Sequence, residues 1–364
     1  MDTIKIKSEL INKVTFDRIT FSVNPDLIEV PSEALETSTK GTKRLNIIEL
    51  VENENSKEFY YKLHEKRTDF FVLEIVPSRV FHKKQHNIYA VTIEEVVIAI
   101  EEVLKKLKEK HHINISLDAL SLASIEINKT VETSSDLKTF EDSLVYLFGG
   151  RVKTDKRENH NSFTITASYQ KKSEKFYDKS AQIKNDLKVC PDLKLARFEI
   201  TYKYPNLIKN EFGTLDIRKI TQEQIEDKFY KEIENLENNL VKYMVKDSIK
   251  LYNFFKKFGK TGSTELDDIY KEFNSKKLTV SAVRVPFFEI TKLAIKQLYK
   301  DLGVASCNAS RDAKKVVGVR AEAEFNNLKN LSNLLQSFSN AETKCNKYKV
   351  LEKKLQQGFR ANFS

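Results

Sequence analysis

A tyrosine lies between two lysines in the segment KFYDK, so that Tyr177 is two residues from both Lys175 and Lys179. Positive charge close to a phenol favours the phenolate, and this spacing predicts that the pKa of Tyr177 falls below its usual value of about 10. A phenolate can attack phosphorus when a bound metal polarises a phosphoryl oxygen. The segment therefore predicts a tyrosine that forms a covalent bond to a phosphate group.

Three acidic side chains interrupt segments that are otherwise typical of apolar strands. Glu126 lies in LSLASIEINKTVE, Glu199 in LKLARFEITYKY and Glu74 in DFFVLEIVPS. A charged side chain in such a strand costs free energy unless it is paired or binds something. Clustered carboxylates bind hard divalent cations through oxygen, so these residues predict a magnesium or manganese site.

Strand alternation sorts these side chains onto faces. One face of the strand at 120–131 presents Ser124, Glu126, Asn128 and Thr130, and one face of the strand at 195–204 presents Arg197, Glu199, Thr201 and Lys203. If both strands neighbour the one that holds Tyr177, their polar faces form one surface. The alternative is a solvated sheet face with exposed ion pairs, each worth about 0–1 kcal/mol.

The pattern of the whole chain predicts an α+β fold followed by a helical region. We expect strands at 13–23, 44–51, 59–63, 69–78, 120–132, 162–169, 173–183 and 193–204. We expect helices at 92–110, from Ser134 or Ser135 to about 148, and at 221–258, 265–274, 285–302, 310–337 and 341–358. These elements predict an α+β domain at 1–215 and a helical region for DNA binding or oligomerisation at 221–364.

Positive charge is concentrated in two parts of the 364-residue chain, whose formal net charge is +10. Residues 151–194 hold 11 basic and 6 acidic residues, and residues 310–364 hold 11 and 5. Clustering of this kind is typical of a surface that binds a polyanion such as DNA. The alternative is a lysine-rich composition without a nucleic-acid partner. The candidate DNA-binding residues are Arg151, Lys171, Lys172, Lys175, Arg197 and Lys203.

Other metal and nucleotide motifs are absent from the sequence. There is no His-hydrophobic-His triplet, the three cysteines form no CxxC pair, and there is neither a GxxxxGK[ST] nor a GxGxxG motif. In FHKKQHN, after the strand with Glu74, His86 is a further candidate metal ligand. The alternative, given equal weight, is that this segment is an ordinary surface loop.

The chain has no apolar run of membrane-spanning length, and the segment MDTIKIKSELINK lacks an apolar secretory core. We therefore expect a cytoplasmic protein without a membrane partner.

Four segments, in order, resemble the filamentous-phage gene II/X family of replication initiators. They are VLEIVPSRVFHKKQHNIYAVT at 72–92, LASIEINKT at 122–130, KFYDKSAQI at 175–183 and LARFEITYK at 195–203. A more distant likeness links them to the transfer-type Rep proteins of small Gram-positive plasmids. The resemblance covers about residues 13–215. The chain departs from the family where Ala123-Ser124 replaces a Ser-Arg pair and Glu126 stands where aspartate is common.

The resemblance implies an antiparallel-sheet, HUH-like nickase domain that lacks the His-hydrophobic-His motif. Such proteins are site-specific single-strand endonucleases that start and end rolling-circle replication. By this resemblance Tyr177 is the nucleophile and Lys179 orients the scissile phosphate. The implied metal ligands are Glu126 and Glu199, with Glu74 and His86 as further candidates, and Arg197 either lies near phosphate or locks an acid.

The implied partners are single-stranded or supercoiled origin DNA and the helicase and polymerase of a bacterial host, with a homodimer left open. Two other functions compete with this interpretation. A non-enzymatic initiator binds origin repeats and recruits host replication factors. A metal-dependent nuclease uses water as its nucleophile and does not need Tyr177.

Overall fold

The computed structural model describes residues 3–37, 43–51, 58–67, 70–133, 147, 152–153, 164–168, 172–259, 288–303, 307, 309–317, 331–339 and 347–362. The chain divides into two compact units. The first consists of Met1–Ser134 with Lys153–Lys231, and the second of Ser135–Val152 with Glu232–Ser364. The predicted domain boundaries at 215 and 221 stay a prediction.

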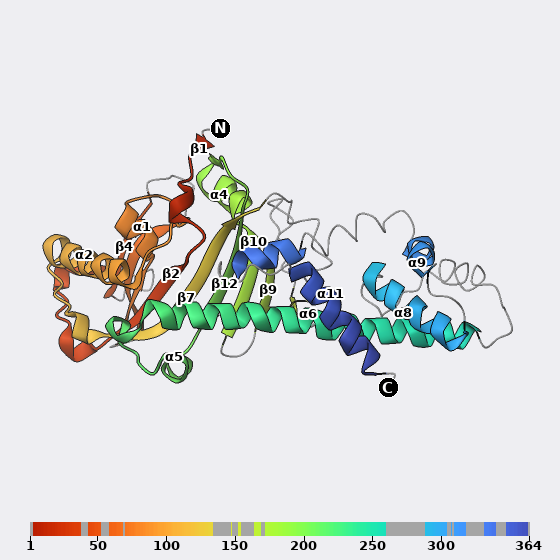
Figure 1. The fold of residues 1–364 in the computed structure, drawn as a ribbon. Helices are drawn as coiled ribbons and strands as arrows, with labels where there is room; N and C mark the ends of the chain where they lie inside the picture. The colour runs from red at the N-terminus through yellow and green to blue at the C-terminus, as the bar shows by residue number, and fades with distance from the viewer. Residues whose placement is uncertain are drawn as a thin grey trace. The chain divides into compact units, whose positions relative to one another are not determined.

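A ten-stranded sheet forms the centre of the first unit (Figure 1). Its strand order is β3-β4-β5-β6-β2-β7-β12-β10-β9-β8, and the pairings from β3 to β9 are antiparallel. The strands are β2 (Val14–Val23), β3 (Leu35–Thr37), β4 (Lys43–Leu50), β5 (Phe59–Arg67), β6 (Phe70–Ile75), β7 (Leu120–Glu132), β8 (Val152–Lys153), β9 (Thr164–Ser168), β10 (Lys172–Asp178) and β12 (Leu195–Tyr202). A separate parallel pair joins β1 (Thr3–Ile4) to β11 (Cys190–Pro191).

Helices lie among these strands in the sequence. They are α1 (Pro77–His82), α2 (Ile93–His111), α4 (Lys179–Leu187), α5 (Pro205–Phe212) and the first part of α6 (Gln222–Gly259). The predicted start of α2 is confirmed, because Thr92 and Glu95 form a reciprocal capping box. The mixture of an antiparallel sheet with helices confirms the predicted α+β class.

Two predicted strands end earlier than their sequence pattern indicates. β10 stops at Asp178, whose Oδ1 accepts a hydrogen bond from the Ala181 backbone N–H at 2.8 Å and so caps α4. Lys179 is therefore the first residue of a helix and not part of a strand. β6 stops at Ile75, and Pro77 occupies the first turn of α1, where its fixed backbone angle suits a helix.

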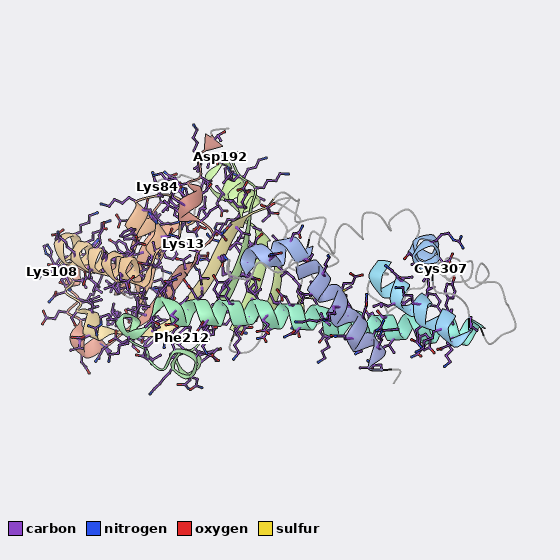
Figure 2. All side chains as sticks on the ribbon, in the orientation of Figure 1. Lys13, Lys84, Lys108, Asp192, Phe212 and Cys307 are labelled. Carbon is purple, nitrogen blue, oxygen red and sulfur yellow. The ribbon has the colours of Figure 1, made fainter. Side chains whose placement is uncertain are left out.

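One face of the central strands is apolar and packs against helices. Ile125 and Ile127 of β7 and Phe198 and Ile200 of β12 are fully buried. The Phe198 ring meets Phe229 of α6 with ring centroids 5.6 Å apart. Tyr202 of β12 similarly meets Phe212 of α5 at 5.5 Å; Phe212 is labelled in Figure 2. The predicted apolar faces are thus core contacts, and the opposite faces of the same strands hold the charged side chains.

Apart from Val152 of β8, the second unit is helical in its described part. It contains the remainder of α6, α8 (Phe288–Asp301), α9 (Ala309–Val317), a helical run at 331–338 and α11 (Lys347–Arg360). The predicted helix at 265–274 lies outside the described residues, as does the one after Ser134 except for the buried Leu147. The stretch predicted as one helix at 310–337 is described only at its two ends. Within the described ranges, no helix has the length and apolar character needed to cross a membrane.

Candidate active site

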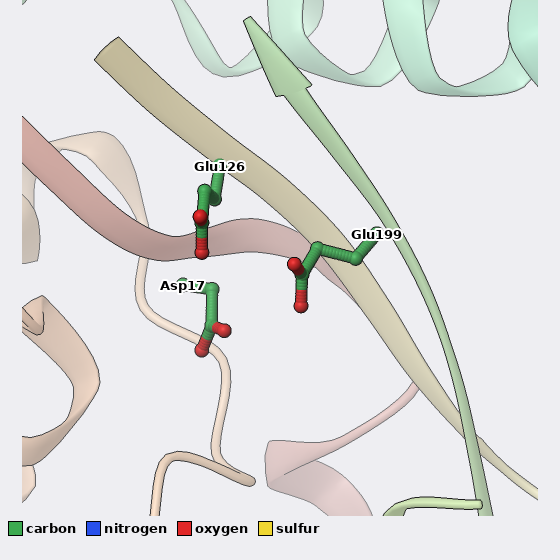
Figure 3. A group of neighbouring side chains, drawn as sticks. All are labelled: Asp17, Glu126 and Glu199. Atoms are coloured by element: carbon green, nitrogen blue, oxygen red, sulfur yellow. The ribbon is translucent and has the colours of Figure 1, made fainter. Parts of the chain in front are cut away.

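Three carboxylates from neighbouring strands come together in the first unit. Asp17 of β2, Glu126 of β7 and Glu199 of β12 each offer an oxygen, and these oxygens lie within 4.8 Å of one another. Figure 3 shows the three side chains, each from a different strand. The predicted pairing of Glu126 with Glu199 is present, and the structure adds Asp17.

Asp17 was missing from the predicted ligands, although its sequence context contains a signal. It is an acid within the strand-like segment KVTFDRITFSV, the same anomaly that drew attention to Glu74. Its placement depends on an irregularity in the β2–β7 pairing, where the register shifts between Phe16 and Ile19. Such an irregularity changes the direction in which nearby side chains point. No local sequence pattern indicates that Asp17 is the side chain affected.

The charged faces of β7, β12 and β10 form one surface, which we call the polar face. Across it, Glu126 lies opposite Thr201, Asn128 opposite Glu199, Thr130 opposite Arg197, Lys175 opposite Glu199 and Tyr177 opposite Arg197. The predicted adjacency of the three strands is therefore confirmed. Asn128, Arg197 and Glu199 are buried, so the alternative of a solvated sheet face is wrong for these residues.

Arg197 is fully buried, and its guanidinium group forms hydrogen bonds with other groups of the protein. Its Nη1 contacts Asp17 Oδ1 at 2.9 Å, its Nε donates to Thr130 Oγ1 at 2.8 Å, and its Nη2 donates to the backbone carbonyl of Asn87. Burial alone raises the pKa of Asp17, but Arg197 and other nearby cations outweigh it and lower that pKa to about 2. In this structure Arg197 thus locks an acid in its ionised form.

Glu199 connects Tyr177 to a lysine. Lys175 Nζ donates to one carboxylate oxygen at 2.7 Å, and the Tyr177 hydroxyl donates to the other at 3.1 Å. Burial, together with the Glu199 charge, raises the pKa of Tyr177 well above its ordinary value. The predicted lowering of this pKa is therefore wrong, because desolvation and an adjacent carboxylate outweigh the flanking lysines. The hydroxyl instead faces a base that can accept its proton.

Lys179 lies beside the same network, 1% exposed. Its Nζ donates to Asn87 Oδ1 and Gln182 Oε1, both at 2.7 Å, and lies 5.7 Å from the centroid of the Tyr177 ring. Burial and the neighbouring Arg197 lower its pKa to about 7. The Asn87 Nδ2 group donates in turn to Asp17 Oδ1, so this asparagine links the lysine to the carboxylate group.

The three neighbouring carboxylates of Asp17, Glu126 and Glu199, which we call the carboxylate group, suit a hard divalent cation. Burial and the nearby Glu199 charge raise the pKa of Glu126 to about 8. Two carboxylates this close do not both ionise readily without a compensating positive charge. An all-oxygen donor set that includes an acid with such a pKa suits magnesium or manganese. Asp17, Glu126 and Glu199 are the residues that would hold the ion.

The other predicted ligands lie apart from this group of three. Glu74 of β6 lies opposite Thr20 and Lys62, and its Oε1 is 3.9 Å from His64 Nδ1. His86 is buried, and its Nδ1 accepts a hydrogen bond from the Ile88 backbone N–H at 3.5 Å. Burial and the adjacent Lys179 lower the pKa of His86 to about 4. Their roles as metal ligands stay predictions.

The predicted DNA-binding lysines and arginine of segment 151–194 are described in part. Lys172 is half-buried and pairs with Glu174 at 2.8 Å. Arg151 and Lys171 lie outside the described residues. Lys203 follows β12 and is half-buried. Their contacts with DNA stay predictions.

Neither a protein-family model nor a curated protein sequence matches the chain. Among solved structures, the chain is similar to one described as a rolling circle replication initiator protein from Geobacillus stearothermophilus. The two share 11% sequence identity with a TM-score of 0.29, over 63% of this chain and 84% of the other. A similarity at this level assigns neither a fold nor a function to this chain.

Proposed function

We propose that this protein initiates rolling-circle DNA replication as a metal-dependent, site-specific DNA nickase that forms a phosphotyrosine. The strongest support is the hydrogen bond of 3.1 Å from the Tyr177 hydroxyl to Glu199, within a group of three carboxylates. The family resemblance assigned these two residues to separate sequence segments, and the fold brings them together. A nucleophile, a base and a metal site are the components that phosphoryl transfer requires.

Asp17, Glu126 and Glu199 would hold the divalent cation, and a bound cation would supply Lewis-acid polarisation of the scissile phosphate. Glu199 accepts the phenol proton, and Tyr177 Oη attacks phosphorus. The bond from phosphorus to the 3′ oxygen breaks as the bond to Tyr177 forms. Glu199 returns its proton to the departing 3′ oxygen, which leaves a free 3′ hydroxyl for a polymerase. The reverse reaction religates the product.

Access to Tyr177 is part of this proposal, because its side chain is only 8% exposed. The segment around Asn87 lies over the polar face, where it contacts Asp17, Lys179 and Arg197. Val91 also bonds Thr15 in both directions at 2.9 Å. We expect this segment to move when a DNA strand enters.

The helical unit is proposed to hold the origin strand. A cavity of about 610 Å³ lies between α8 and α11, lined by Leu293, Lys296, Gln297, Lys300, Gln356, Phe359 and Arg360. Three of these side chains are cationic and none is acidic, so the cavity complements a phosphate backbone. Host helicase and polymerase are the further partners that such an initiator needs.

A covalent adduct is the test of this function. Purified full-length protein is incubated with Mn²⁺ and a labelled single-stranded origin, and the labelled protein is resolved under denaturing conditions. We expect an adduct for the wild type and none for Tyr177→Phe, which still binds the strand. Tyr230→Phe is a matched control, because Tyr230 lies on α6 against Lys129 and away from the carboxylates. An adduct with Tyr177→Phe would show that the nucleophile is wrong.

A metal-dependent nuclease that uses water is the second candidate, favoured by one observation. The raised pKa of Tyr177 keeps the phenol protonated in this structure, which suits a residue that only positions other groups. Such an enzyme cleaves without an adduct and survives Tyr177→Phe, but not Glu126→Gln or Glu199→Gln. Binding without cleavage of any origin strand would favour the non-enzymatic initiator.

A further inference from the structure

The two glutamates of the carboxylate group occupy opposite corners of a four-residue patch. In the antiparallel β7–β12 pairing, Glu126 lies opposite Thr201, and Asn128 lies opposite Glu199. Residues two apart on a strand share a face and are about 6.6 Å apart along it, whereas opposite residues have Cβ atoms about 5 Å apart. A group held between the two glutamates therefore lies over Asn128 and Thr201 as well.

These two remaining corners contain buried polar atoms without partners. Asn128 is 1% exposed, and neither its Nδ2 nor its Oδ1 has a hydrogen-bond partner in the described structure. Thr201 is 7% exposed, and its Oγ1 is unpaired in the same way. A buried amide without a partner costs free energy, and native proteins keep few of them. Such groups beside a functional site point to a ligand that satisfies them.

The neighbouring strand β2 does not provide a hydrogen-bond partner for the Asn128 side chain either. The residue of β2 that lies opposite Asn128 is Thr15. The Thr15 hydroxyl is already used, because it donates to the Val91 carbonyl and accepts from the Val91 N–H, both at 2.9 Å. The amide of Asn128 is thus left for whatever binds above the polar face.

We propose that Asn128 is a ligand of the same site: its Oδ1 binds the divalent cation and its Nδ2 donates to a phosphate oxygen of the strand. This inference rests on the proposed function. Amide carbonyl oxygens are ordinary ligands of hard cations. A neutral ligand also suits a site that already contains three carboxylates, because it adds an oxygen without adding repulsion.

The test measures cation affinity and stability separately from nicking. Mn²⁺ is titrated into full-length wild type, Asn128→Val and Ser124→Ala by calorimetry, without DNA. We expect Asn128→Val to weaken binding by about tenfold or more, as changes close to a bound metal do. Ser124→Ala serves as the matched control, since Ser124 lies on the same face of β7 on the other side of Glu126. It should leave the affinity unchanged.

Urea unfolding without metal separates a ligand from a structural residue. Removing an unpaired buried amide should leave the midpoint of Asn128→Val equal to that of the wild type or higher. A lower midpoint would mean that Asn128 stabilises the fold, and would overturn the inference. Unchanged Mn²⁺ affinity in Asn128→Val, with loss in Glu126→Gln, would overturn this inference alone. Absence of Mn²⁺ binding by the wild type would overturn the proposed function as well.

Discussion

The affinity of the protein for Mn²⁺ should rise steeply between pH 6 and pH 8, because the cation competes with a proton for Glu126. The pKa of this carboxyl is raised to about 8 by burial and by Glu199. With that pKa, about 1% of the carboxyl is ionised at pH 6 and about half at pH 8. The apparent affinity should therefore increase about 50-fold over this range, equivalent to about 2.3 kcal/mol.

Glu126→Gln isolates this effect. An amide resembles the protonated acid, so the variant should match the wild type at pH 6 and bind up to about 50-fold more weakly at pH 8. Lys179, whose pKa is about 7, loses its positive charge in the same pH range, which also favours cation binding. The wild type and Glu126→Gln therefore share a smaller rise of affinity with pH from this lysine. His86 titrates lower, with a pKa of about 4, and does not contribute.

Isothermal titration calorimetry at constant ionic strength measures the affinity. Repeating it in two buffers with different ionisation enthalpies counts the protons released. The reasoning is refuted if wild type and Glu126→Gln show the same slope, or differ equally at pH 6 and pH 8. In the metal-free protein, the raised pKa of Glu126 makes the folded state less stable at high pH. The stability that the protonated Glu126 carboxyl contributes is complete below the ordinary pKa of 4.5 and is lost as the pH rises through about 8.

The remaining predictions concern stability and DNA binding. Arg197→Met leaves Asp17 buried without its partner and should lower the free energy of unfolding by about 3–5 kcal/mol, measured in urea; a loss under 1 kcal/mol would contradict this. Thr92→Ala removes the capping box of α2 and should cost about 1 kcal/mol in the same assay, whereas an unchanged midpoint would argue against it. The triple variant Lys296→Ala, Lys300→Ala and Arg360→Ala should bind single-stranded DNA with a weaker salt dependence. The slope of log K against log salt concentration should decrease in magnitude by about 2. An unchanged slope, measured by fluorescence anisotropy, would exclude the cavity from the DNA path.

Local patterns in the sequence were enough to identify several parts of the first unit. Alternation placed Glu126 and Glu199 on the polar faces of their strands and assigned Ile125, Ile127, Phe198 and Ile200 to the core. The capping box at Thr92 fixed the start of α2. These predictions hold because strand alternation and helix capping depend on residues within a few positions of one another.

Tertiary structure alone decided how these parts combine. The third carboxylate, Asp17, reaches the group through strand order and an irregular pairing between β2 and β7, which no short segment contains. Burial and the neighbouring Glu199 reverse the direction of the pKa shift predicted for Tyr177 from its flanking lysines. Sequence spacing indicates which charges are close along the chain. Desolvation and contacts between distant strands, which dominate the energetics of this site, exist only once the chain has folded.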